Sequence, residues 1–175
     1  MLELIGLIKF VIIINMHIHF VCSGNSYRSR LAEAYCKSKL KGQEIIISSS
    51  GTVADENKIK NGPISWYAMR LMMRNNLIQF MSWKQRQTTV EILKDVDLLI
   101  CMTQSHLDFC QNELGYINKP SKVWGIPDLN EMNGFIPSTK PGIETDINHI
   151  KLTEQIYIVI TQKVDDLVKR ITNIV

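Results

Sequence analysis

Short runs of β-type residues alternate with segments of helical composition along this chain from residue 16 to its end. The strand-like runs are 17–21, 44–48, 97–102 and 121–126, and the helical segments are 29–41, 63–75, 88–94, 103–114 and 147–172. Strands that alternate with helices pair in parallel and are joined by right-handed crossovers. The pattern therefore predicts an α/β fold: a single-domain three-layer sandwich with a central four-stranded parallel sheet flanked by helices.

The composition agrees with one globular domain. The 175 residues are enough for one substantial core, and 45% of them are hydrophobic and 21% charged. The net charge of +3 is too small to indicate a nucleic-acid partner, although it would help an anionic substrate to approach. The four cysteines lack the spacing of a zinc site, so we expect reduced thiols, no metal and a cytoplasmic location.

Residues 1–15 form an apolar run that stands apart from the rest of the pattern. The run is too short to span a bilayer and is interrupted by Glu3 and Lys9, so we expect no stable membrane insertion. It lacks the basic start and the small-residue cleavage site of a signal peptide. We expect an N-terminal extension, or a start codon assigned upstream of Met16, followed by the domain at 16–175.

An open parallel sheet binds its ligand at the carboxyl ends of its strands. Four segments follow the predicted strands and should lie at that edge: 22–29, 48–52, 102–106 and 127–131. The chemistry of this chain is therefore expected among these segments. The first of them, CSGNSYRS, carries the strongest pattern.

Segment 22–29 ends a strand and opens a helix, an arrangement whose unpaired backbone N–H groups bind anions. The same N–H groups would favour an ionised thiolate at Cys22. The planar guanidinium of Arg28 can bind two phosphoryl oxygens at once, and the hydroxyl of Ser29 can stabilise the thiolate when it leaves. The C-x5-R-S spacing therefore predicts that Cys22 attacks a phosphate.

The remaining residues of this segment suit a phosphate-binding loop. Gly24 permits a tight turn, and Asn25 tolerates a left-handed backbone conformation. The predicted substrate-binding set is Ser23, Gly24, Asn25, Ser26, Tyr27, Arg28 and Ser29. The G-x4-G-K-[ST] pattern of nucleotide-binding loops is absent from the sequence. A buried cysteine beside a solvated arginine remains the purely structural alternative.

The segment resembles the active-site loop of the low-molecular-weight protein tyrosine phosphatases, which reads V-C-x-G-N-x-C-R-S and is followed by an Ala-Glu pair. This chain has VCSGNSYRS and then Ala32-Glu33. Other family motifs have counterparts in the same order: SSGT at 49–52, RQTT at 86–89, DLLICM at 97–102 followed by His106, and IPD at 126–128. The resemblance covers about residues 16 to 172.

This resemblance implies an enzyme that hydrolyses phosphotyrosine in proteins, and aryl phosphates, through a phosphocysteine intermediate and without a cofactor. It implies Cys22 as the nucleophile, Arg28 as the phosphate clamp and Asp128 as the general acid. The supporting residues would be Ser29, Asn25 and Ser49. The implied partner is a phosphotyrosine-containing protein, such as a tyrosine kinase of polysaccharide export, and the expected assembly is a monomer or weak dimer.

The chain departs from the family pattern around the implied general acid. Leu129 follows Asp128 where the family has a proline, and the aromatic residues expected just beyond are missing. The assignment of Asp128 therefore depends on its position after the fourth strand. Glu131 and Asp146 are the alternative acids.

Other departures concern the pocket wall and the loop itself. Trp66 or Tyr67 could replace the missing aromatic wall, although aromatic residues on a helical face more often serve packing. Tyr27 stands where many members have a second loop cysteine, and Trp83 stands where some have a histidine that braces the loop. We expect structural rather than catalytic roles for three histidines, His17, His19 and His106.

Two other functions stay open. A thiol-based arsenate reductase shares this fold and loop but needs resolving cysteines in a mobile segment. Cys101 lies in a predicted buried strand and Cys110 on the following helix, which is poor geometry for such a relay. A non-catalytic phosphate-binding module would need no nucleophile, and this alternative gains support only if Asp128 is misplaced.

Overall fold

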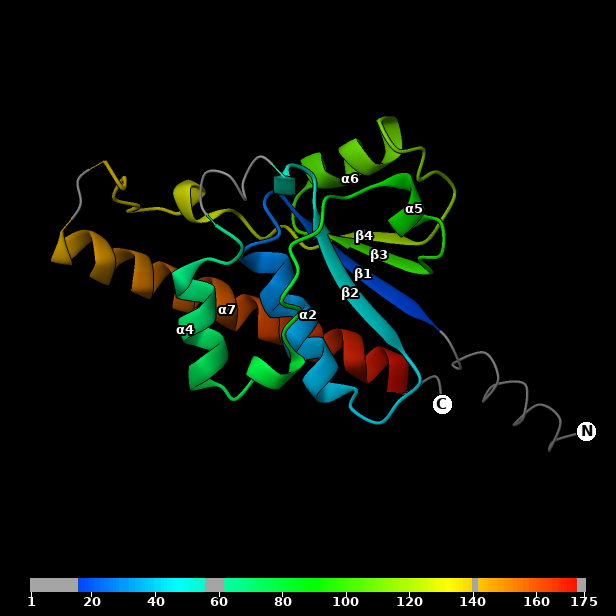
Figure 1. The fold of residues 1–175 in the computed structure, drawn as a ribbon, viewed down its shortest axis with the longest axis horizontal. Helices are drawn as coiled ribbons and strands as arrows, with labels where there is room; N and C mark the ends of the chain where they lie inside the picture. The colour runs from blue at the N-terminus through cyan, green and yellow to red at the C-terminus, as the bar shows by residue number, and fades with distance from the viewer. Residues whose placement is uncertain (1–15, 56–61, 140–141, 173–175) are drawn as a thin grey trace, which may run out of the picture.

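The computed structural model describes residues 16–55, 62–139 and 142–172, so the predicted N-terminal extension lies outside the described residues. Its centre is a sheet of four strands: β1 (His17–Cys22), β2 (Ile46–Gly51), β3 (Leu98–Cys101) and β4 (Ser121–Val123). The strand order is β2-β1-β3-β4, and each neighbouring pair is parallel (Figure 1). The predicted fold class and the four-stranded parallel sheet are confirmed.

Helices lie on both faces of this sheet, which confirms the three predicted layers (Figure 1). They are α2 (Arg28–Lys39), α4 (Trp66–Arg74), α5 (Val90–Leu93), α6 (Gln104–Asn112) and α7 (Ile143–Thr172), with the short 3-10 helices η1 (Ile78–Phe80) and η2 (Leu129–Glu131). Side chains of β1 point alternately to the two faces. Phe20 is buried in the core under α2, α4 and α7, whereas Val21 is buried in the core under α5 and α6.

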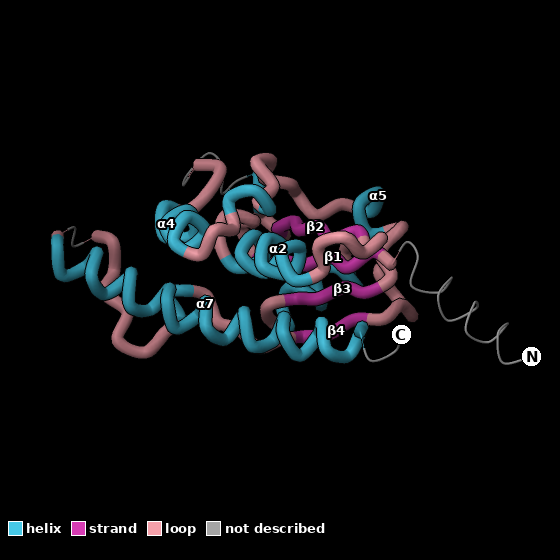
Figure 2. Tube along the Cα trace, turned by 90° about the horizontal axis from the view of Figure 1, so that it is seen from below, coloured by secondary structure: helices cyan, strands magenta, loops and turns pink. Residues whose placement is uncertain are grey.

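The long helix α7 runs along the face that also carries α2 and α4 (Figure 2). Its buried residues recur about one helical turn apart, at Ile156, Ile160 and Val164 among others, which is the pattern that predicted the helix. The helix begins earlier than the predicted start at residue 147. No helix in the described part of the chain is long and apolar enough to cross a membrane.

Helix α4 begins later than predicted, because a tertiary contact holds the residues before it extended. The sequence favoured Pro63 as the first helical residue, but Ser65 is the N-cap, with φ −64° and ψ 133°. The backbone N–H of Ser65 donates to the carbonyl of Ser26, 2.9 Å away, in the predicted phosphate loop. This bond connects the start of α4 to the segment that follows β1.

The carboxyl ends of β1 and β2 lie side by side, with Cys22 paired to Gly51. A Cβ atom on Gly51 would lie 2.4 Å from the carbonyl oxygen of Ser23 and 2.6 Å from the backbone nitrogen of Asn25. Only glycine therefore fits at the end of β2. The phosphate loop rests directly on this strand end, at the edge where a parallel sheet binds ligands.

Candidate active site

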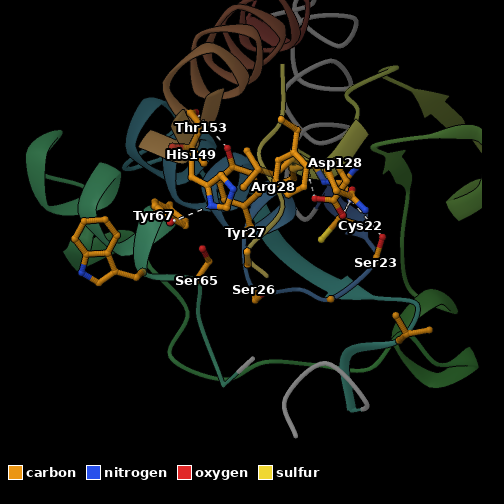
Figure 3. Close-up of a pocket in the computed structure, with 17 residues that line it drawn as sticks. Cys22, Ser23, Ser26, Tyr27, Arg28, Ser65, Tyr67, Asp128, His149 and Thr153 are labelled. Carbon is orange, nitrogen blue, oxygen red and sulfur yellow. Dashed lines mark hydrogen bonds and ion pairs between the residues drawn. The ribbon is translucent and has the colours of Figure 1, made fainter. Parts of the chain in front are cut away.

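Cys22 is the last residue of β1 and lines a cavity of about 440 Å³ (Figure 3). Its side chain is nearly inaccessible, with 2% of the residue exposed. Its Sγ lies 3.0 Å from the hydroxyl of Ser29, in the first turn of α2. Among the described residues, no side chain caps the N-terminus of α2, where unpaired N–H groups favour an anion.

Asn25 supports the loop from within. Its φ of 47° is the left-handed conformation expected from the sequence. Its Nδ2 donates to the hydroxyl of Ser29 at 3.0 Å and to the hydroxyl of Ser49 at 2.8 Å. Its Oδ1 accepts the backbone N–H of Arg86 at 2.9 Å, and Ser49 in turn donates to the buried carboxylate of Glu33. This network fixes Ser29 beside the cysteine sulfur.

A second brace comes from segment 84–87 and was not predicted. The Gln85 side chain donates to the carbonyl oxygen of Gly24. Arg30, which is 1% exposed, donates to the carbonyl of Lys84 at 2.8 Å and so fixes this segment to the buried side of α2. Trp83, which stands at the family's histidine position, is 67% exposed and contributes no hydrogen bond to this brace. Gln85 contacts the loop instead.

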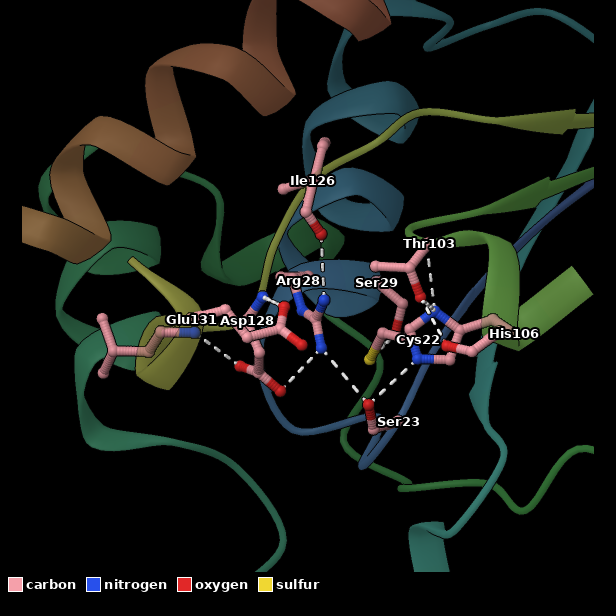
Figure 4. A network of polar contacts seen from close by, with 11 residues as sticks. Cys22, Ser23, Arg28, Ser29, Thr103, His106, Ile126, Asp128 and Glu131 are labelled. Atoms are coloured by element: carbon pink, nitrogen blue, oxygen red, sulfur yellow. Dashed lines mark hydrogen bonds and ion pairs between the residues drawn. The ribbon is translucent and has the colours of Figure 1, made fainter. Parts of the chain in front are cut away.

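Arg28 is buried beside the cavity, and its guanidinium contacts three segments (Figure 4). Nη1 donates to the carbonyl of Ile126 at 3.0 Å. Nη2 donates to the hydroxyl of Ser23 at 3.3 Å and to Oδ2 of Asp128 at 2.7 Å. These contacts hold the guanidinium plane next to Cys22, so a phosphate over the sulfur would meet a fixed cation.

Asp128 follows β4 and is the N-cap of η2, a helix that was not predicted. Its Oδ1 accepts the backbone N–H of Leu129 at 2.8 Å, a donor that the family's proline lacks. Its own N–H donates to the Glu131 carboxylate at 2.7 Å, so Glu131 serves as the other half of a capping box.

Asp146, the other alternative acid, is exposed, and its carboxylate lies 3.5 Å from the hydroxyl of Tyr67. Of the three candidate acids, Asp128 is the one that contacts Arg28.

Aromatic side chains line the cavity beyond the phosphate loop. Trp66 and Tyr67 at the start of α4 both line it, and Trp66 is 61% exposed. Tyr67 also packs against the ring of His149, with centroids 5.5 Å apart. Phe135, from the segment after η2, lines the same cavity and is stacked on His149, with ring centroids 4.9 Å apart and planes 2° apart. Aromatic side chains thus line the cavity although none directly follows Asp128, and Phe135 is the one among them that the sequence did not indicate.

Helix α7 holds Phe135 in this position through two consecutive residues. Asn148 donates to the carbonyl of Gly134 at 2.9 Å and accepts the N–H of Ile136 at 3.0 Å. The buried ring of His149 lies with Nε2 2.6 Å from the Ile136 carbonyl and Nδ1 3.1 Å from the hydroxyl of Tyr67. The wall therefore joins α4, α7 and the segment after η2. No sequence pattern indicated the part formed by Phe135 and His149, because these contacts join segments that are far apart in the sequence.

Tyr27 replaces the second loop cysteine and anchors the loop to α7. Its hydroxyl donates to the carbonyl of Thr153 at 3.2 Å, and burial raises the pKa of this phenol far above its ordinary value. The remaining cysteines, Cys36, Cys101 and Cys110, are all free thiols and 0% exposed. Within the described ranges, no group of three or more potential metal-ligating side chains occurs.

His106 caps α6 together with Thr103, the structural role expected from the sequence. Its other ring nitrogen, Nε2, lies 2.9 Å from the hydroxyl of Ser23 (Figure 4). Burial, and next the charge of Arg28, lowers the pKa of His106 to about 4. A neutral imidazole therefore borders the phosphate loop at neutral pH.

Comparison with known proteins identifies relatives of this site and fold. The sequence is 28% identical over 102 residues to a protein-arginine-phosphatase of Bacillus subtilis (strain 168), a match that covers 57% of this chain and 64% of that protein. The chain thus spans less than two thirds of this curated relative.

Solved structures share the fold. Wzb of Vibrio vulnificus, in complex with benzylphosphonate, matches with a TM-score of 0.67 and 17% identity over 89% of this chain and 98% of its own. SP-PTP, a low molecular weight protein tyrosine phosphatase from Streptococcus pyogenes, also has a TM-score of 0.67, with 20% identity over 89% of this chain and 92% of its own. The sequence matches the low molecular weight phosphotyrosine protein phosphatase family over residues 17–173. Because this match spans most of its length, the chain belongs to that family.

Proposed function

We propose that this protein is a cysteine-dependent phosphatase that hydrolyses phosphotyrosine in proteins. The observation that carries this proposal is the convergence of Cys22, Arg28 and Asp128 on one cavity, with Arg28 bonded to Asp128 at 2.7 Å. A nucleophile, a cation for the phosphoryl oxygens and a proton donor for the leaving group are the parts that phosphate transfer to a thiolate requires.

In the first step, the thiolate of Cys22 attacks phosphorus while the bond to the tyrosine oxygen breaks. Asp128 donates its proton to that oxygen, so the product leaves as a neutral phenol. Arg28 and the backbone N–H groups of the loop bind the equatorial phosphoryl oxygens as their charge grows. The product of this step is a phosphocysteine.

In the second step, water attacks the phosphocysteine and the sulfur–phosphorus bond breaks. The carboxylate of Asp128 accepts a proton from the attacking water. The hydroxyl of Ser29, 3.0 Å from Sγ, donates a hydrogen bond to the departing thiolate. Inorganic phosphate leaves, and both side chains return to their starting protonation states.

The Arg28–Asp128 ion pair is exposed to competition from the substrate. A phosphate dianion would compete with the Asp128 carboxylate for the donors on Nη2 of Arg28. Substrate binding would therefore weaken the ion pair between the two side chains.

The lining of the cavity supports an aromatic phosphate ester as substrate. Trp66, Tyr67 and Phe135 offer ring surfaces against which a phenyl ring can pack. The structurally similar Wzb of Escherichia coli K30 is named a tyrosine phosphatase. A phosphotyrosine-containing protein, such as a tyrosine kinase of polysaccharide export, is the partner that we infer.

A second candidate substrate is phosphoarginine, because the curated relative is named a protein-arginine-phosphatase. Ser26, Ser65 and Ser138 also line the cavity, and their hydroxyls suit a polar guanidinium leaving group. An arsenate reductase is less well supported. The cysteines it would need as relay, Cys101 and Cys110, are fully buried in a strand and a helix.

The proposed function is tested by hydrolysis of an aryl phosphate, a phosphotyrosine peptide and a phosphoarginine peptide. Cys22→Ser should abolish turnover of all three, while Cys36→Ala, a buried cysteine of α2 outside the site, should keep wild-type turnover. Arg28→Lys should lower kcat/KM by about a hundredfold or more, because an ammonium cannot bind two oxygens at once. Full activity of Cys22→Ser would contradict the mechanism.

The same assay separates the two substrates. Phe135→Ala should raise KM for the phosphotyrosine peptide by about tenfold, because the substrate ring loses a contact surface. A chain that turns over phosphoarginine much faster than phosphotyrosine, and is indifferent to Phe135→Ala, would support the second candidate instead.

A further inference from the structure

The hydrogen bonds around His106 determine which ring nitrogen carries the proton. Nδ1 lies 3.1 Å from the backbone nitrogen of Thr103. A backbone N–H can only donate, so Nδ1 must be the acceptor and is unprotonated. In the neutral imidazole the hydrogen therefore sits on Nε2, which donates to the hydroxyl oxygen of Ser23 at 2.9 Å.

The hydroxyl of Ser23 accepts a second hydrogen bond, because Nη2 of Arg28 can only donate and lies 3.3 Å away. A serine hydroxyl has two acceptor lone pairs and one hydrogen. With both lone pairs engaged by His106 and Arg28, its own hydrogen points away from both. Ser23 lines the cavity beside Cys22, so its hydroxyl hydrogen can bond to an oxygen of a phosphate bound there.

The opposite tautomer would reverse this arrangement. An unprotonated Nε2 would accept the hydroxyl hydrogen of Ser23 and leave an oxygen lone pair facing the phosphate. Two facing lone pairs repel each other, so the site would lose a donor and gain a repulsive contact. The N-cap bond from Thr103 excludes that tautomer as long as α6 is formed.

We propose that His106 is a positioning residue of the phosphate site, because it fixes the Ser23 hydroxyl as a hydrogen-bond donor to the phosphoryl oxygens. Ser23 is the group that touches the substrate, and His106 acts through it. This inference rests on the proposed function. It adds the Ser23 hydroxyl to the donors of the phosphate site, held in its donor orientation by a residue of α6.

The test is the affinity of the intact chain for inorganic phosphate, measured by calorimetry and as a competitive inhibition constant. Ser23→Ala and His106→Phe should each weaken phosphate binding and lower kcat/KM by about tenfold, the effect of losing a hydrogen bond to a charged group. The double variant should bind no more weakly than Ser23→Ala alone, because His106 acts through Ser23. His106→Gln, which keeps an N–H donor, should recover most of the affinity.

The matched control is Ser105→Ala, on the same turn of α6. Ser105 bonds to the hydroxyl of Thr103 at 2.9 Å but does not contact Ser23, so its loss should leave phosphate affinity unchanged. A purely structural His106 would lower the melting temperature without changing phosphate affinity, or would add its effect fully to that of Ser23→Ala. Either result would overturn the proposal.

Nitrogen NMR of the wild-type imidazole gives a second measurement that does not depend on variants folding. We expect the signature of a neutral ring protonated at Nε2 between pH 6 and 8, and protonation at Nδ1 would refute the inference. A wild type that binds phosphate but hydrolyses no ester would contradict the proposed function while leaving the role of His106 supported.

Discussion

Arg28 and Asp128 form an ion pair in the lining of the cavity, with Nη2 and Oδ2 2.7 Å apart. The two residues come from the start of α2 and from the segment after β4, so the fold has to bring together positions a hundred residues apart. The Arg28 side chain is 3% exposed and that of Asp128 is 41% exposed. The cation is therefore buried and the carboxylate is open to the cavity, which is the division of roles expected for a clamp and a proton donor.

Asp128→Asn should slow the enzyme according to how much the leaving group needs a proton. A tyrosine phenolate, with a pKa near 10, leaves poorly as an anion. We expect a loss of about a hundredfold or more with a phosphotyrosine peptide and a much smaller loss with a nitrophenyl phosphate. The basic limb of the pH–rate profile should disappear as well, because it reports deprotonation of the acid.

Glu131→Gln is the matched control for this experiment, because Glu131 carries the alternative carboxylate but caps the Asp128 backbone. Glu131→Gln should lower activity with the phosphotyrosine peptide far less than Asp128→Asn does. Equal losses on both substrates for Asp128→Asn would indicate a structural role. If Glu131→Gln lost activity with phosphotyrosine but not with nitrophenyl phosphate, the general acid would be Glu131 instead of Asp128.

Hydrogen peroxide should inactivate this protein in a way that thiol reductants do not reverse. Oxidation of the Cys22 thiolate yields a sulfenic acid, which survives only if a neighbouring thiol traps it. Tyr27 occupies the position of the usual trapping cysteine, and Cys36, Cys101 and Cys110 are fully buried. Mass spectrometry should detect sulfinic acid at Cys22. A disulfide from Cys22 to any of the other three cysteines would disprove this expectation.

Gly51→Ala should destabilise the fold and disable the site together. The added Cβ would meet backbone atoms of Ser23 and Asn25 at 2.4 and 2.6 Å, so either β2 or the phosphate loop has to move. We expect a loss of about 3 kcal/mol in the free energy of unfolding, at the upper end of overpacking effects. Gly142→Ala, where no atom lies within 4 Å of the added Cβ, is the control for turnover and should leave it unchanged. Normal activity in Gly51→Ala would mean that the conformation of the phosphate loop does not depend on its close contact with the end of β2.

Acid should destabilise the protein partly through His19. This residue is fully buried between Ser48 and Ser50, and burial, with the charges of His17 and Arg86, lowers its pKa to about 3. The unfolded chain binds a proton there below about pH 6.5, whereas the folded chain does not. Stability from His19 is therefore complete above pH 6.5 and falls by about 1.4 kcal/mol per pH unit below it.

The measurement is urea unfolding of the wild type and of His19→Gln between pH 6.5 and 5, above the range where most carboxylates titrate. The variant should show a shallower loss of stability with falling pH. If the free energy of unfolding fell equally steeply with pH in both proteins, His19 would not be the cause of the acid destabilisation.

The sequence was informative where structure depends on neighbouring residues. The apolar run at 97–102 and the turn around Asn25 are local signals, and each forms the predicted element. The start of α4 was misjudged, because the bond from Ser65 to Ser26 competes with helix formation at Pro63.

The pocket wall could not be predicted for a related reason. The stacking of Phe135 on His149 depends on how α7 packs, and neither residue has a local pattern that indicates a partner. The position of Asp128 after the fourth strand was enough to nominate it as the acid. Its contact with Arg28 required the three-dimensional fold.

The bond from Tyr27 to the Thr153 carbonyl has a consequence for protein synthesis. The loop is made early, yet one of its anchors lies in α7, near the end of the chain. While the ribosome is still translating α7, the loop lacks this anchor and the wall on which Phe135 rests. We therefore expect a nascent chain to remain inactive until α7 has been synthesised and has docked, because only then is the site complete.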